Sequence, residues 1–217
     1  MPTMHNSATT TRNSIYKGTS WSIALAATIL ASGVAHAQVV KPAPLVSIDS
    51  HDKFFAHIKE HCGKAYQGQV SVNNPASGGF EGDLVMHVRV CEDDRIEIPF
   101  HVGDNHSRTW ILTKTGSGIS LKHDHRYEDG DYDEQTMYGG HTMDAGYERA
   151  QSFPVDQYSK ELFYRQGIPA SNTNIWQMFI YPEQFTYRLI REGREFRVDF
   201  DLTTPIDTPA APWGYED

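Results

Sequence analysis

Apolar and polar residues alternate along most of the chain after residue 64, as in strands that bury one face. Leu84, Met86, Val88 and Val90, for example, share one face of a single segment. Short joints rich in Gly, Asp and Asn separate the segments, so we expect consecutive strands to pair antiparallel. The predicted strands are 65–72, 80–91, 95–102, 107–115, 118–126, a weaker one at 146–153, 175–181, 185–191 and 195–202.

Two segments show helical spacing instead. Phe54, Phe55 and Ile58 recur at a helical period, and Asp49 or Ser50 is the expected N-cap. A second short helix is expected to open at Pro154-Val155-Asp156 and to end near residue 165. After the predicted strand that ends at residue 126, residues 127–144 have no apolar period and are predicted to form a long loop.

These elements predict a mostly β fold. We expect an antiparallel meander β-barrel of about eight or nine strands, with an N-terminal helix and one short later helix, because closure removes unpaired sheet edges. The layout is similar to that of lipocalin-like (calycin) barrels, and this likeness implies a small apolar ligand inside. An open β-sandwich is the alternative.

The N-terminus has the three parts of an export signal. Arg12 and Lys17 are the only charged side chains before residue 41, and an apolar run follows at 21–31. This run is about half of the ~20 residues that span a bilayer, and it leads to Ala35-x-Ala37, which fits a signal-peptidase site. We therefore predict a signal peptide at 1–37 and an exported protein, periplasmic or extracellular.

The remaining chain divides simply. We expect an extended lead at 38–48, a single barrel domain at 49–202 and a proline-rich tail at 203–217. Roughly 180 residues suit one core.

Charge narrows the class of partner. Loss of Arg12 and Lys17 with the signal peptide takes the formal net charge from −9 to −11. An acidic surface repels phosphate backbones, which argues against nucleic acid. No stretch of the mature chain is apolar enough for a transmembrane segment.

The only two cysteines, Cys62 and Cys91, lie in the mature part. In an oxidising compartment such a pair is expected to form one disulfide, which would contribute roughly 3–4 kcal/mol in the chain-entropy model. A reactive or metal-binding thiol pair is the alternative.

The densest cluster of reactive side chains extends from Lys122 to Glu134. On a strand, His123 and His125 would point to the same face with Cα atoms about 7 Å apart. Two such imidazoles with an oxygen from Glu128 or Asp129 could hold Zn or Ca. The predicted metal ligands are therefore His123, His125 and Asp129. Further ligands could come from His101, His106 and His141.

The same cluster has a purely structural interpretation. Asp124 could pair with Arg126 or Lys122 at the mouth of the barrel. The carboxylates from Asp129 onward do not form an EF-hand, because Glu134 stands where that loop needs glycine and Gly140 where it needs glutamate. A looser calcium site stays open.

Other chemistry has less support. The chain has no Gly-x-Ser-x-Gly elbow and no phosphate-binding glycine loop. Arg108 and Trp110 share one face of a predicted strand, where arginine could pack over the indole and close the barrel end. Ligand binding by this pair is the alternative. Aromatic residues that could line a pocket, although most should be core, are Tyr66, Phe80, Tyr138, Tyr147, Phe153, Trp176 and Tyr187.

Several short signatures resemble one group of proteins. His123-Asp-His-Arg126-x-Glu-Asp-Gly130 and Tyr138-Gly-Gly140 are similar to sequences of uncharacterised secreted or periplasmic proteins of Gram-negative bacteria. The resemblance implies a location and no activity.

The sequence thus predicts a secreted or periplasmic barrel that binds a small-molecule or lipid-like ligand without catalysis. The candidate ligand contacts are His101, His123, His125, Arg126, Glu128 and Tyr138. The alternatives are a metal-dependent enzyme that uses the paired histidines, and an envelope-associated interaction protein that uses the acidic loop. The oligomeric state is left open.

Overall fold

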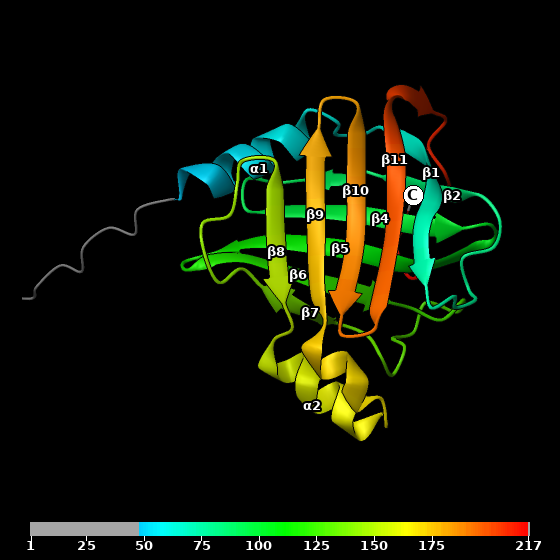
Figure 1. The fold of residues 1–217 in the computed structure, drawn as a ribbon. Helices are drawn as coiled ribbons and strands as arrows, with labels where there is room; N and C mark the ends of the chain where they lie inside the picture. Colours follow the sequence, from blue (N-terminus) through cyan, green and yellow to red (C-terminus); the bar gives the residue numbers. More distant parts are fainter. Residues whose placement is uncertain (1–47, 217) are drawn as a thin grey trace, which may run out of the picture. The chain divides into compact units, whose positions relative to one another are not determined.

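The strands form one antiparallel sheet that curls until its ends approach each other (Figure 1). A computed structural model describes residues 48–216. The order in the sheet is β7-β6-β5-β4-β2-β1-β11-β10-β9-β8, with β3 paired to β4. The strands are β1 (Ala65–Asn74), β2 (Leu84–His87), β3 (Val90–Cys91), β4 (Arg95–Val102), β5 (Asn105–Thr115), β6 (Gly118–His125), β7 (Tyr138–His141), β8 (Ala150–Pro154), β9 (Ile175–Tyr181), β10 (Gln184–Arg191) and β11 (Arg194–Ile206).

The predicted antiparallel barrel is confirmed, with eleven described strands instead of eight or nine. The predicted strand at 80–91 begins later and is divided into β2 and β3. Between these two strands, the N–H of Val88 donates to Lys64 O, directly before β1, and the N–H of Arg89 donates to Glu97 O of β4. The predicted loop at 127–144 contains β7, which alternation could not show in a segment with two adjacent glycines. Strand β11 extends to Ile206, four residues beyond its predicted end.

One of two adjacent glycines in β7 lets the ends of the sheet approach. A Cβ at Gly140 would lie 2.3 Å from Pro154 O at the end of β8, whereas a Cβ at Gly139 would lie 1.9 Å from Leu121 O of β6, the paired neighbour of β7. Without side chains there, Gly140 forms an isolated bridge to Val155, just past the end of β8. The barrel is therefore nearly closed at β7 and β8.

The helices lie at opposite ends of the sheet (Figure 1). Helix α1 (Asp49–Lys59) buries Phe54, Phe55 and Ile58. Its N-cap position is Ile48, without a side-chain cap. The predicted cap at Asp49 or Ser50 is therefore wrong: Asp49 and Asp52 lie in the first turn, where a carboxylate favours the helix dipole.

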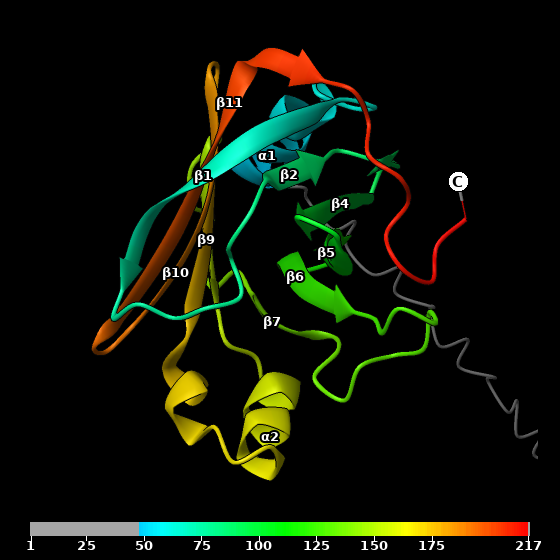
Figure 2. The same cartoon turned by 90° about the vertical axis from the view of Figure 1, so that its right-hand side faces the viewer.

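Helix α2 (Gln157–Arg165) begins as predicted. The side chain of Asp156 accepts a hydrogen bond from the N–H of Ser159 at 2.9 Å, as an N-cap does. A 3₁₀ helix, η1 (Pro169–Thr173), follows and leads into β9. Figure 2 shows α2 below the space between β9–β10 on one side and β6–β7 on the other.

The inward-facing residues of both halves of the sheet form one core. Aromatic rings dominate its centre, where Trp110 stacks between Phe100 and Tyr187 at centroid distances of 4.8 and 4.5 Å. Fully buried neighbours include Phe185 and Phe200. A cavity lies beside this filled centre, toward the α2 end.

The predicted disulfide is confirmed: Cys62, just after α1, is bonded to Cys91 of β3 with the Cα atoms 6.2 Å apart. The predicted signal peptide (1–37) and most of the predicted lead lie outside the described residues. Among residues 48–216, no helix is long and apolar enough to cross a membrane.

Candidate functional site

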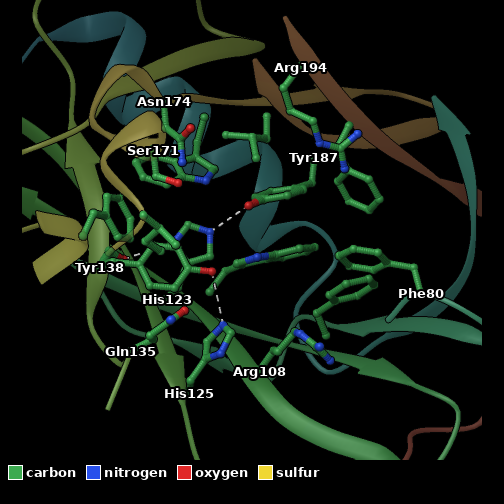
Figure 3. Close-up of a pocket in the computed structure, with 17 residues that line it drawn as sticks. Phe80, Arg108, His123, His125, Gln135, Tyr138, Ser171, Asn174, Tyr187 and Arg194 are labelled. Carbon is green, nitrogen blue, oxygen red and sulfur yellow. Dashed lines mark hydrogen bonds between the residues drawn. The ribbon is translucent and has the colours of Figure 1, made fainter. Parts of the chain in front are cut away.

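A pocket of about 230 Å³ opens at the α2 end of the barrel (Figure 3). Strands β4, β5, β6, β7, β9, β10 and β11 supply its inner wall, and η1 and the end of α2 supply its rim. Its lining is Phe80, Phe100, Arg108, Trp110, His123, His125, Gln135, Tyr138, Phe163, Ile168, Ser171, Asn174, Trp176, Tyr187, Leu189, Arg194 and Phe196.

The register between β5 and β6 sets the polar side of the pocket. Trp110 pairs with His123, and Arg108 pairs with His125. Directly opposed residues in an antiparallel pair point to the same face. Four inward side chains from two strands therefore form one patch, as the predicted i, i+2 histidine pair requires.

His123 is held by two hydrogen bonds. Its Nδ1 lies 3.1 Å from Tyr138 O and its Nε2 lies 2.8 Å from Tyr187 Oη. A carbonyl can only accept, so Nδ1 carries the proton and the Tyr187 hydroxyl donates to Nε2. Burial, with a smaller contribution from neighbouring His125, lowers the pKa of His123 to about 3. The ring is thus neutral and in one tautomer.

His125 faces the same space. Its Nε2 lies 3.3 Å from Tyr138 Oη (Figure 3). Burial and then the charge of Arg108 lower the pKa of His125 to about 4. Burial also raises the pKa of Tyr138 to about 12 and that of Tyr187 well above its usual range. Near pH 7 all four rings are uncharged hydrogen-bonding groups.

Arg108 brings a positive charge to this patch. One guanidinium nitrogen donates to Asn105 Oδ1 at 3.1 Å, and the group lies 5.8 Å from the centroid of the Phe80 ring. The expected packing over Trp110 is wrong, because that indole is already stacked between two other rings. Burial lowers the pKa of Arg108, although an arginine stays protonated at neutral pH.

Two further groups at the rim were not predicted from the sequence. Arg194, at the start of β11, donates to Pro75 O and to Ser77 Oγ. Asn174 is buried, and its Oδ1 has no hydrogen-bond partner within the described part of the chain. No sequence pattern marks either one, since both belong to ordinary turn segments.

The outward residues of β6 belong to a different structure. Asp124 is 2% exposed and accepts from Arg126 Nε at 3.0 Å, Thr136 Oγ1 at 2.9 Å and Tyr215 Oη at 2.7 Å. Arg126 also lies 3.6 Å from the centroid of the Tyr132 ring. The structural interpretation thus holds for Asp124 and Arg126, which anchor the loop and the tail on the outer face.

The remaining predicted site residues are dispersed. Glu128 and Asp129 lie exposed in the loop after β6, where Asp129 Oδ1 accepts from Asp131 N. His101 is buried on the outward side of β4 against His106, at 4.2 Å between ring centroids. His141 bonds to Thr115 Oγ1 at the opposite end of the β5–β6 hairpin.

The structure therefore brings His123, His125 and Tyr138 together and separates them from Arg126, Glu128, Asp129 and His101. Within residues 48–216, no group of three or more His, Cys, Asp or Glu side chains is placed to hold a metal ion. Both ring nitrogens of His123 are already hydrogen-bonded. The metal hypothesis stays a prediction.

Of the aromatic residues proposed to line a pocket, four do so: Phe80, Tyr138, Trp176 and Tyr187. Tyr66 and Phe153 are core residues, and Tyr147 is exposed. Chemically, the site offers flat apolar walls, neutral donors and acceptors, and guanidinium groups. No protein-family model, curated protein or solved structure matches the chain.

Proposed function

We propose that this chain is an exported binding protein that holds a small molecule inside its barrel, without catalysing a reaction. The observation that carries the proposal is the pocket at the α2 end, walled by aromatic rings and bordered by polar groups with hydrogen-bonding capacity. Concave, mostly apolar sites with a few placed polar groups are the usual form of small-molecule sites.

The apolar part of the pocket suits a flat or linear hydrocarbon body. Trp110, Trp176 and Phe196 are among the aromatic residues that line the cavity. At about 230 Å³, the cavity is below the ~300–1,000 Å³ typical of drug-sized ligands. We therefore infer a compact ligand and not a long lipid chain.

The polar part fixes orientation. Asn174 Oδ1, buried at the rim with no partner in the described chain, would gain from a ligand donor, because an unsatisfied buried acceptor costs about 1–3 kcal/mol. His123 is a poor general base here, since its pKa is about 3 and its Nε2 already accepts from Tyr187. These features favour binding over acid–base catalysis.

The test is native mass spectrometry of protein purified without denaturant from the cells that make it. We expect a second mass above that of the bare chain, released on denaturation. Ser171→Phe, which places a ring at the pocket rim, should abolish it. The matched variant Ser117→Phe, in the exposed turn at the other end of the β5–β6 hairpin, should retain it. A bare mass alone in the unaltered protein would refute the proposal.

Export is the second part of the proposal. It is supported by the charged, apolar and small-residue segments up to Ala37, and by the Cys62–Cys91 disulfide, a bond that persists in oxidising compartments. Intact-mass measurement of the secreted or periplasmic fraction should give a chain that begins at Gln38. A chain that keeps its first 37 residues in the cytoplasm would contradict it.

A further inference from the structure

We propose that the ligand is a small organic carboxylate whose acid group pairs with Arg108. This inference rests on the proposed function and specifies its ligand class.

The pocket is positive although the protein is acidic. The chain carries a formal net charge of −9, yet the pocket lining contains two arginines and no aspartate or glutamate. The inner histidines are neutral near pH 7, so they do not alter this balance. An anion would therefore find a local excess of positive charge in this pocket.

Arg108 lacks the carboxylate partner that a partly buried guanidinium normally has. Its polar neighbour is the neutral amide oxygen of Asn105, and it forms no ion pair with any residue of the described chain. Several arginines outside the pocket, in contrast, do pair: Arg126 with Asp124, Arg188 with Glu195 and Arg197 with Asp199. A desolvated charge without a counter-ion is costly, so an anionic ligand group would relieve that cost.

The surroundings of Arg108 favour an organic acid over an inorganic anion. The guanidinium lies over the Phe80 ring, and Trp110 and Phe100 lie beside it in the lining. A planar carboxylate can accept two parallel hydrogen bonds from a guanidinium, while its hydrocarbon body would cover the rings. Phosphate would place a strongly hydrated ion against the same apolar walls.

The probes are 3-phenylpropionate and its neutral amide, 3-phenylpropionamide, titrated by calorimetry. We expect the unaltered protein to bind the acid at least about tenfold more tightly than the amide, since charged hydrogen bonds contribute more than neutral ones. Arg108→Gln should remove this preference. Arg149→Gln, which changes an arginine outside the pocket whose Nη1 donates to Ile180 O, should keep it.

Each outcome is decisive. Equal binding of acid and amide would overturn the carboxylate inference while leaving a small-molecule barrel intact. Binding of neither probe, or equal stabilisation by inorganic phosphate, would also overturn the inference, and the co-purifying mass would then decide the proposed function separately. If Arg108→Gln does not fold, Arg108→Lys serves instead: it retains the charge without the planar fork and should keep a reduced preference for the acid.

Discussion

The two faces of β6 use adjacent residues for opposite purposes. Inward, His123 and His125 are neutral rings in a pocket, held by the hydroxyls of Tyr187 and Tyr138. Outward, Asp124 is a buried carboxylate that receives donors from the loop and from the tail. The difference arises from the alternation of a strand, which sends neighbours to opposite faces.

This contrast shows that density of reactive residues along a sequence does not define one site. On the outer face the buried charge has a structural role, because the Asp124 carboxylate accepts hydrogen bonds from Arg126, Thr136 and Tyr215. The inner face has fewer charges, and the Arg108 guanidinium there has no ion-pair partner in the described chain, so we infer that it binds a ligand. Variants on each face should therefore separate stability from binding.

The largest effect is expected from Asp124→Ala. Its removal would leave Arg126 and Tyr215 without their shared acceptor, and breaking a buried pair costs about 3–5 kcal/mol. Urea unfolding should show this loss, while binding of 3-phenylpropionate by the folded fraction stays unchanged. Asp104→Ala, in an exposed turn, is the control. A loss below about 1 kcal/mol would mean that the outer cluster does not hold the fold.

The next effect concerns pH. Because the pKa of His123 is about 3 in the folded chain against 6.5 as its ordinary value, the unfolded chain binds a proton first as the pH falls. The stability contributed by the neutral ring is complete above about pH 6.5 and decreases below it, by about 1.4 kcal/mol per pH unit, down to about pH 3.

The measurement is the free energy of unfolding from pH 7 to pH 4. His123→Gln should flatten its slope. His101→Gln should flatten it too, since burial and then the nearby charges of His106 and His87 lower the pKa of His101 to about 4, but without changing ligand affinity. An unchanged slope in His123→Gln would show that this ring is not held neutral.

Tyr187→Phe should have a smaller effect. It removes the donor to His123 Nε2, and a buried acceptor left unsatisfied costs about 1–3 kcal/mol. Thermal unfolding would measure it, with Tyr181→Phe, a half-exposed position, as the control. Equal stability of the two variants would show that the hydrogen bond between Tyr187 and His123 does not stabilise the fold.

Tyr215→Phe should have the smallest effect, about 1 kcal/mol, because Asp124 keeps its other donors. Limited proteolysis should cut the tail after residue 206 faster in this variant. A tail that stays equally protected from the protease would show that other contacts hold it, such as the hydrogen bond from Trp213 N to His106 O.

Alternation was enough to predict the barrel, the pairing of consecutive strands and the common face of His123 and His125. It could not predict β7, since Gly139 and Gly140 carry no apolar signal and matter only through how closely β6 and β8 approach them. Nor could it predict that β11 brings Arg194 to the pocket rim, because that depends on how the sheet curls.

The candidate site was predictable only in its strand part. Residues of β6 were found by spacing, and Tyr138 only as one of several aromatic residues that could line a pocket. Loop residues such as Glu128 and Asp129 were expected nearby because they follow closely in sequence, but the chain turns outward after His125. His101 was expected inside although its neighbours Phe100 and Val102 take the inward face of β4.

Histidine-ring NMR during titration with 3-phenylpropionate compares the two faces in one sample. We expect the ring resonances of His123 and His125 to shift with saturation, and those of His101 and His106, on the outer side, to stay in place. Shifts confined to His101 and His106, with the inner rings unmoved, would place binding outside the barrel and contradict the assignment of the pocket.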